Sequence, residues 1–134
     1  MKIDGNCHCG AIKFEAEADP EAGVICHCND CQRLSGSPYR VMFPVPATAF
    51  SISGSPATYI KVAESGRRRA QVFCRECGSA IYSTDVDQPS IFAVRLGVIN
   101  QRREMGPPVR QIWCDEALAW SGELAATPRV PRQV

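Results

Sequence analysis

Apolar and polar residues alternate along several short segments of this chain, and a glycine or proline stands between most of them. The clearest example is Ile12-Lys13-Phe14-Glu15-Ala16, in which every second residue is apolar and the others are charged. Such a period of two is typical of a strand with one face in the core and the other in water. The same reasoning predicts further strands over residues 40–45, 50–53, 57–62, 71–73, 80–83, 90–96 and 109–113. We therefore expect a mainly β protein.

One segment favours a helix. Asn29 can cap a short helix over residues 30–34, which Ser35 and Gly36 then end. Residues 64–67, which contain a glycine, lie between two predicted strands and indicate a hairpin connection. Overall, the pattern predicts one helix of one or two turns among many strands.

The length of 134 residues suits one domain with one hydrophobic core. We expect this single domain to occupy residues 1–126. In the tail over 127–134, Pro128 and Pro131 stand among polar and basic residues. This composition predicts an extended arm or a disordered tail.

The charge of the chain is nearly balanced, with 15 basic and 14 acidic residues. A balanced charge provides no long-range attraction to nucleic acid or to an anionic membrane, so we expect neither partner. No apolar run approaches the ~18 residues that a membrane span requires, and the N-terminus lacks a secretory leader pattern. We therefore expect a cytoplasmic protein, in which eight cysteines need a purpose other than disulfides.

Two of the cysteine motifs end in glycine and have the spacing of zinc knuckles. They are Cys7-His8-Cys9-Gly10 and Cys74-Arg75-Glu76-Cys77-Gly78. Each motif supplies two thiolates, and tetrahedral zinc takes four ligands, so we expect one closed structural site made by Cys7, Cys9, Cys74 and Cys77. The alternatives are unrelated buried thiols, or a redox pair at the second motif; that pair lacks the βαβ context such motifs need.

A third motif places three cysteines within six residues, at Cys26, Cys28 and Cys31. Three thiolates leave one position of a tetrahedral zinc free, which is the mark of a catalytic site. Cys31 also falls in the first turn of the predicted helix, where the helix dipole favours a thiolate. A zinc ion with three sulfur ligands is better matched to an incoming thiol than to water. The motif therefore predicts thiol activation rather than hydrolysis.

Cys114 leaves two interpretations open. It can supply a fourth thiolate and so close the second zinc site, which would make that site structural. Alternatively, it is a small buried residue of a core strand, because it follows Ile112 and Trp113. His8 and His27 are each flanked by cysteines, so we expect their rings to point away from the metal and to serve supporting or surface roles.

The cysteine motifs, read with their neighbours, resemble a known family. The three stretches are G-x-C-x-C-G-A-I-x-F at residues 5–14, C-H-C-x-x-C-x-R at 26–33 and F-C-x-x-C-G-S-x-I at 73–81. In this order they resemble the glutathione-dependent formaldehyde-activating enzyme family, which also includes centromere-protein-V-like proteins. The resemblance continues through Ser35-Gly36-Ser37, residues 50–59, 94–97 and 112–120, and so covers nearly the whole chain.

The resemblance implies a β-tent fold, with antiparallel sheets packed around cysteine zinc sites. It also implies that the first four cysteines hold a structural zinc and that Cys26, Cys28 and Cys31 hold a catalytic zinc. The named reaction joins formaldehyde to the thiol of glutathione to give S-hydroxymethylglutathione, and the enzyme is classed as a carbon–sulfur lyase. This chain departs from the family pattern at residues 97–100, Gly-Val-Ile-Asn rather than G-T-L-D, and at Gln111, where a histidine or acidic residue is common.

The leading hypothesis is thus a zinc-dependent carbon–sulfur lyase acting on adducts of a glutathione-type thiol with an aldehyde. We expect two zinc sites. The second, made by three cysteines, is expected to bind zinc more weakly and to be only partly occupied. An arginine near the three cysteines, Arg33 or Arg40, is expected to hold the carboxylates of glutathione. The competing hypothesis is a non-catalytic zinc module with two closed structural sites, used for protein interaction or thiol carriage.

Overall fold

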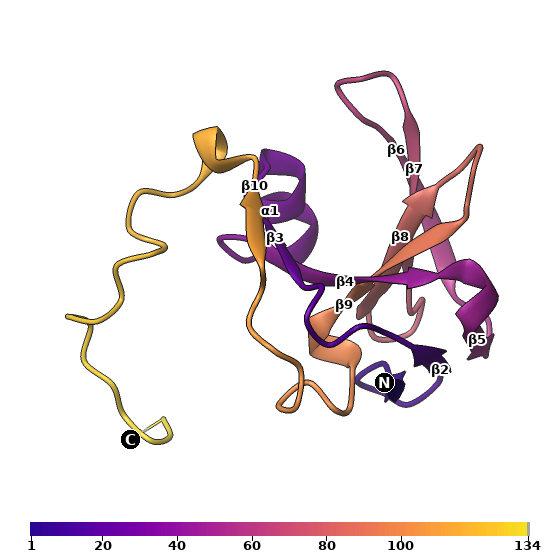
Figure 1. The fold of residues 1–134 in the computed structure, drawn as a ribbon, viewed down its shortest axis with the longest axis horizontal. Helices are drawn as coiled ribbons and strands as arrows, with labels where there is room; N and C mark the ends of the chain where they lie inside the picture. The colour runs from indigo at the N-terminus through magenta and orange to yellow at the C-terminus, as the bar shows by residue number, and fades with distance from the viewer. Residues whose placement is uncertain (134) are drawn as a thin grey trace.

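The computed structural model describes residues 1–133, which form two β-sheets and one short α-helix (Figure 1). The strands are β1 (Lys2–Asn6), β2 (Lys13–Glu17), β3 (Val24–Cys26), β4 (Arg40–Pro46), β5 (Phe50–Ser53), β6 (Ala57–Val62), β7 (Arg68–Phe73), β8 (Ala80–Asp85), β9 (Ile91–Arg95) and β10 (Arg110–Ile112). The helices are α1 (Asn29–Ser35) and the 3-10 turns η1 (Ala47–Ala49), η2 (Leu96–Val98) and η3 (Cys114–Glu116). The expected fold class, mainly β with one short helix and cysteine clusters, is confirmed.

The strands are arranged in a three-stranded sheet, β1-β2-β5, and a seven-stranded sheet, β10-β3-β4-β9-β8-β7-β6. Neighbouring strands pair antiparallel except at one edge, where β10 runs parallel to β3. Parallel neighbours need a long connection, and here most of the chain lies between the two strands. The expected antiparallel arrangement therefore holds for the other strand pairs of residues 1–133, and this edge is the exception.

The core lies between the two sheets and follows the predicted alternation. Phe14 on β2 is buried while Lys13 and Glu15 beside it are exposed, and Phe43 and Val45 on β4 are also buried. Phe14 stacks on Phe50 of the small sheet, and Phe50 in turn meets aromatic rings of β8 and β9 edge-on. Because β4 puts every second residue into this core, its remaining side chains point to the opposite face of the large sheet.

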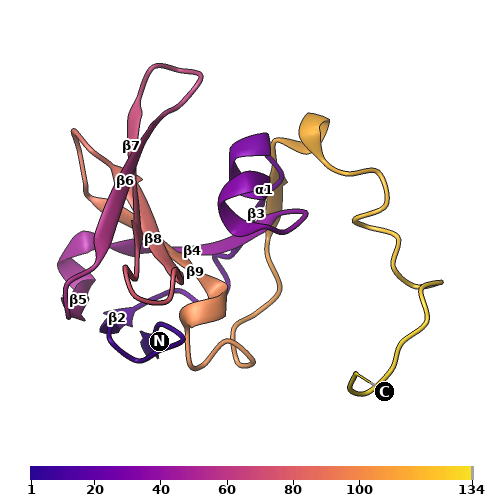
Figure 2. The same ribbon diagram turned by 180° about the vertical axis from the view of Figure 1, so that it is seen from behind.

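Helix α1 stands on one side of the molecule and the β6–β7 hairpin on the other, with β4 running between them (Figures 1 and 2). The helix ends as predicted at Gly36, whose left-handed backbone has φ 64°. Its N-cap is Cys28 and not Asn29, since the Cys28 sulfur accepts a hydrogen bond from the backbone N–H of Cys31. This cap was not expected from the sequence because cysteine is not a common capping residue.

After β10 the chain turns through η3 and continues to residue 133 without a strand or helix (Figure 1). Cys114 is exposed in η3, so the expectation of a buried cysteine in a core strand is wrong. Trp113 and Trp120 are exposed as well. The boundary expected at residue 126 stays a prediction. Among residues 1–133, no helix has the length and apolar character needed to cross a membrane.

Candidate metal centres

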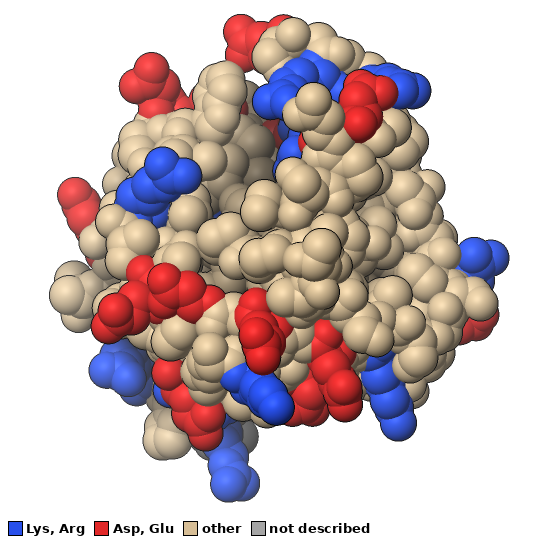
Figure 3. Space-filling model, turned by 45° about the vertical axis from the view of Figure 1, so that its right-hand side comes forward, with Lys and Arg blue, Asp and Glu red and all other residues tan. Residues whose placement is uncertain are grey.

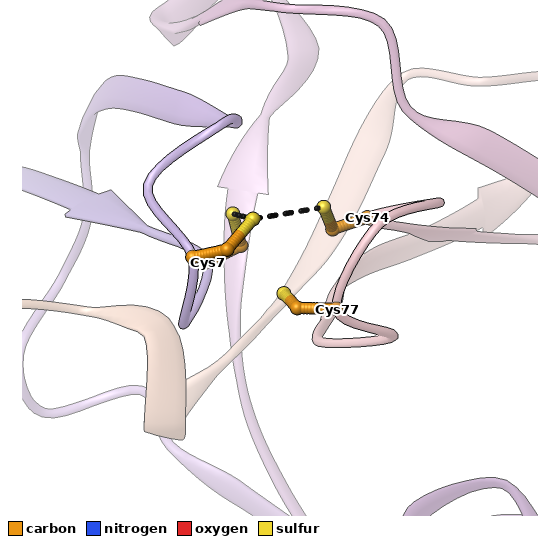
Figure 4. Close-up of side chains that lie close together, drawn as sticks. Cys7, Cys74 and Cys77 are labelled. Atoms are coloured by element: carbon orange, nitrogen blue, oxygen red, sulfur yellow. Dashed lines mark hydrogen bonds between the residues drawn. The ribbon is translucent and has the colours of Figure 1, made fainter.

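The four-cysteine group brings together two loops that are far apart in the sequence. The Cys7 and Cys9 sulfurs lie 3.7 Å apart, and the Cys9 and Cys74 sulfurs lie 3.8 Å apart. Figure 4 shows the side chains of Cys7, Cys74 and Cys77 turned toward a common centre. All four sulfurs lie within 4.8 Å of one another.

These separations fit a tetrahedral zinc ion. Four sulfurs at ~2.3 Å from a central ion stand ~3.8 Å from one another, which matches the Cys7–Cys9 and Cys9–Cys74 sulfur separations. Two members of the group, Cys7 and Cys74, are almost fully buried, whereas Cys9 and Cys77 are exposed. The residues therefore fit a closed site at the edge of the core.

Both loops are tight turns that a glycine makes possible. Gly10 and Gly78 have φ of 82° and 80°, and their N–H groups donate to the carbonyls of Cys7 and Cys74. The backbone N–H of Ile12 donates to the Cys7 sulfur at 3.2 Å, a contact that favours the thiolate. Glycine adopts positive φ without the clash that a Cβ would bring, so both knuckle turns predicted from the motifs are present.

Ser79 supports this group from the side of the second turn. Its hydroxyl lies 3.2 Å from the Cys77 sulfur, and this contact contributes most to a lowered pKa of Cys77, about 5. The same hydroxyl accepts a hydrogen bond from the backbone N–H of His8. One serine therefore links the two loops and favours the thiolate form that zinc requires.

The three-cysteine group lies where β3 ends and α1 begins. The sulfurs of Cys26, Cys28 and Cys31 are all within 4.8 Å of one another, and the group of mutually close ligand atoms has no fourth member among residues 1–133. Cys26 and Cys31 are buried and Cys28 is partly exposed. A set of three thiols this close fits a zinc ion that keeps one position for another ligand.

The thiols of this group differ in pKa because their surroundings differ. Hydrogen bonding with the side chain of Cys26 and the charge of Arg40 lower the pKa of Cys31 to about 5. The same contact, with burial, raises the pKa of Cys26. Cys31 is therefore the member that most readily becomes a thiolate.

A cleft of about 460 Å³ opens between α1 and the β6–β7 side of the large sheet. Its lining residues include Leu34 of α1, Tyr59 of β6, Tyr82 of β8, Arg40 and Arg95. The face of the molecule in Figure 3 shows a hollow in its upper part with basic side chains beside it, while acidic and basic groups are interspersed elsewhere.

The structure distinguishes the two arginines that the sequence offered for the substrate. Arg40 is buried and stands directly opposite Cys26 in the β3–β4 register. Arg33 is exposed and lines a different hollow. Arg95 and Gln71, which the sequence argument missed, share the cleft with Arg40. Each of these two residues is a polar residue within a predicted strand of mostly apolar residues, and this could have indicated a site. A single sequence does not show whether such a residue is buried.

The histidines and Cys114 lie outside both cysteine groups. His8 is exposed, whereas His27 is buried and its Nε2 lies 2.7 Å from Oε1 of Gln111. Gln111 thus serves as the partner of His27 in this chain. Because exposed Cys114 is not among the mutually close sulfurs, the second site is not closed by a fourth cysteine.

A family model described as "Glutathione-dependent formaldehyde-activating enzyme" matches residues 2–116 of this chain. The chain belongs to this family. The match includes both cysteine groups and ends at the last residue of η3.

Relatives share parts of the same region. The chain is 29% identical over 99 residues to a Halomonas elongata protein named "Putative glutathione-dependent formaldehyde-activating enzyme", covering 68% of this chain and 61% of that protein. It is 27% identical over 81 residues to an uncharacterized lyase of Schizosaccharomyces pombe, covering 60% of this chain and 56% of the relative. The matched regions thus span less than two thirds of the length of these family relatives.

The fold also matches a solved structure. A Rhodobacter sphaeroides protein superposes with a TM-score of 0.63 and 19% sequence identity, over 81% of this chain and 98% of the other. At this level of identity the likeness shows a shared fold.

Proposed function

We propose that this protein is a zinc-dependent carbon–sulfur lyase that forms and cleaves adducts of a glutathione-type thiol with formaldehyde or a related aldehyde. The observation that carries the proposal is the three-cysteine group, Cys26, Cys28 and Cys31, which has no fourth ligand among residues 1–133. Arg40, which stands opposite Cys26 in the β3–β4 register, lines the cleft and so connects it to this group. Family membership supports the thiol and the aldehyde as substrates, and one relative is itself named a lyase.

Each part of this site has a defined task under the proposal. Zinc held by the three cysteines would act as a Lewis acid that lowers the pKa of a thiol entering the free position. The N-terminal turn of α1 fixes Cys31 against Cys28 through the 3.2 Å hydrogen bond from the Cys31 N–H. The cleft walls, among them Val72, Phe73 and Leu34, shield the reacting sulfur from part of the solvent.

The reaction is balanced without a further reagent. In the forward direction the thiol loses its proton and its sulfur forms a bond to the aldehyde carbon. The π bond of the carbonyl group breaks, its electron pair moves to the oxygen, and the oxygen takes up a proton. The product is the S-hydroxymethyl adduct, and the reverse direction breaks the same carbon–sulfur bond. Holding both partners in one cleft favours the step because it removes the entropy cost of their encounter.

The test is a direct measurement of adduct formation. Exchange NMR on glutathione and formaldehyde, with reduced zinc-loaded protein, should show a faster interconversion of thiol and adduct than the buffer alone. Cys31→Ser should reduce this acceleration at least ~100-fold, since it removes a ligand of the reacting site.

Cys114→Ser is the matched control, because this cysteine is exposed and lies outside both groups. It should retain the acceleration of the parent protein. Equal rates for the Cys31→Ser and parent proteins, or no acceleration by the zinc-loaded parent, would contradict the proposal.

A further inference from the structure

Two buried arginines face the same cleft and meet at one neutral side chain. Arg40 Nη1 donates to Oε1 of Gln71 at 3.1 Å, and Arg95 Nη2 donates to the same oxygen at 3.2 Å. Arg40 lies on β4, Arg95 on the adjacent β9, and Gln71 on β7 across the intervening β8. Both guanidinium groups belong to residues that are only 7% exposed.

Neither arginine is paired with a carboxylate of residues 1–133. None of the ion pairs formed by the side chains of residues 1–133 includes Arg40 or Arg95. The Nε atoms of both residues are buried without a hydrogen-bond partner in this part of the chain. Burial and the nearby charge of Arg40 lower the pKa of Arg95 to about 9, so the side chain remains protonated at neutral pH. Two like charges are thus held together at an energetic cost.

Both arginines therefore keep N–H donors for a further partner, and both line the cleft. A guanidinium pair with free donors is suited to a planar carboxylate, which accepts two parallel hydrogen bonds.

We propose that Arg40, Arg95 and Gln71 form a carboxylate-binding subsite that selects a thiol substrate bearing an anionic group. The inference rests on the function proposed above, because the thiol would bind between this subsite and the three-cysteine group, whose Cys26 stands opposite Arg40. The carboxylate of the substrate accepts hydrogen bonds from donors that the two guanidinium groups leave free, and its sulfur enters the free position among the three cysteines. Gln71 holds the two guanidinium groups at one point and acts as a positioning residue.

Two small thiols that differ only in charge test the subsite. Calorimetric titration of zinc-loaded protein with 3-mercaptopropionate and with 3-mercaptopropionamide measures binding rather than turnover. The parent protein should bind the carboxylate at least about tenfold more tightly, as expected for a charge-assisted hydrogen-bonded pair. Arg95→Met should bring the ratio close to one, whereas Arg103→Met, at an exposed position, should leave it unchanged.

Gln71→Glu provides a second variant that does not depend on losing an arginine. It places a carboxylate of nearly the same shape between the two guanidinium groups, so it should raise the thermal midpoint and abolish the preference for the anionic thiol. Gln88→Glu, on the exposed loop before β9, is the matched control and should do neither.

The outcomes separate this inference from the proposed function. If the parent binds both thiols equally, or if Gln71→Glu lowers the thermal midpoint, the arginines are not an open anion site and the inference is wrong. If the parent binds neither thiol, the proposed thiol chemistry fails and the inference fails with it.

Discussion

The two cysteine groups of this protein are built in opposite ways. The four-cysteine group joins residues 7–9 to residues 74–77, so its sulfurs come from loops that only the folded chain brings together. The three-cysteine group is local, because all of its members lie between residues 26 and 31. The first group is complete by itself, while the second is completed by no other cysteine of residues 1–133.

The residues around the two cysteine groups also differ. Tight turns and a serine hydroxyl surround the four-cysteine group, whereas the three-cysteine group lies next to buried Arg40, which lines the cleft. A complete ligand set leaves no position for a substrate and stabilises the fold by closing a long loop. An incomplete set beside buried cationic side chains suits a further ligand. Under the proposed function, the same residue type thus serves structure at one site and chemistry at the other.

The largest expected effect is at the four-cysteine group. Cys74→Ser removes one of four thiolates from a site that ties the N-terminal loop to the β7–β8 turn. Structural zinc contributes ~10–16 kcal/mol in small domains, more than the ~5–15 kcal/mol by which most domains are stable. We therefore expect the variant to lose cooperative thermal unfolding, as measured by circular dichroism. Retention of the parent midpoint would remove the structural role assigned to this group.

A smaller effect on stability is expected at the three-cysteine group. Cys31→Ser should leave a folded protein whose thermal midpoint lies close to that of the parent, because α1 keeps its other contacts. Elemental analysis should find one zinc per chain in this variant instead of two. If this variant unfolds as readily as Cys74→Ser, the distinction between a structural and a catalytic group is wrong.

The smallest effect is expected from the neighbours of the ligands. Ser79→Ala removes the hydroxyl that contacts the Cys77 sulfur and accepts from the His8 N–H. Loss of such a supporting contact typically lowers metal affinity ~10–100-fold. A competition titration with a zinc chelator should show weaker binding at the four-cysteine group alone. Weaker binding at the three-cysteine group as well would mean that the two sites are coupled.

Much of the fold could be predicted from the sequence, because alternation is a local property. The predicted ranges 50–53 and 57–62 coincide with β5 and β6, and the range 40–45 falls one residue short of β4. Strands β1 and β3 were not predicted. β1 contains Gly5 and Asn6, which are uncommon in strands, and β3 has only three residues, too few to show a period.

The two cysteine groups could also be predicted, since zinc knuckles depend on spacing and on a glycine at a fixed place. The cationic pair of Arg40 and Arg95 could not. Its geometry depends on strand order, which places β9 beside β4 and brings Gln71 across β8. Cys114 was misplaced for a similar reason, because the strand before it ends at Ile112 and the chain turns at Trp113, with φ 57°.

The central claim is that the three-cysteine group keeps a position for the sulfur of a substrate. Zinc-edge X-ray absorption on reduced, zinc-loaded protein measures the number of sulfurs around the metal directly. With four sulfurs at one site and three at the other, the average should be about 3.5 per zinc, and glutathione should raise it toward 4. A sulfur shell that is already 4 without glutathione, or that does not change when glutathione is added, would contradict the claim.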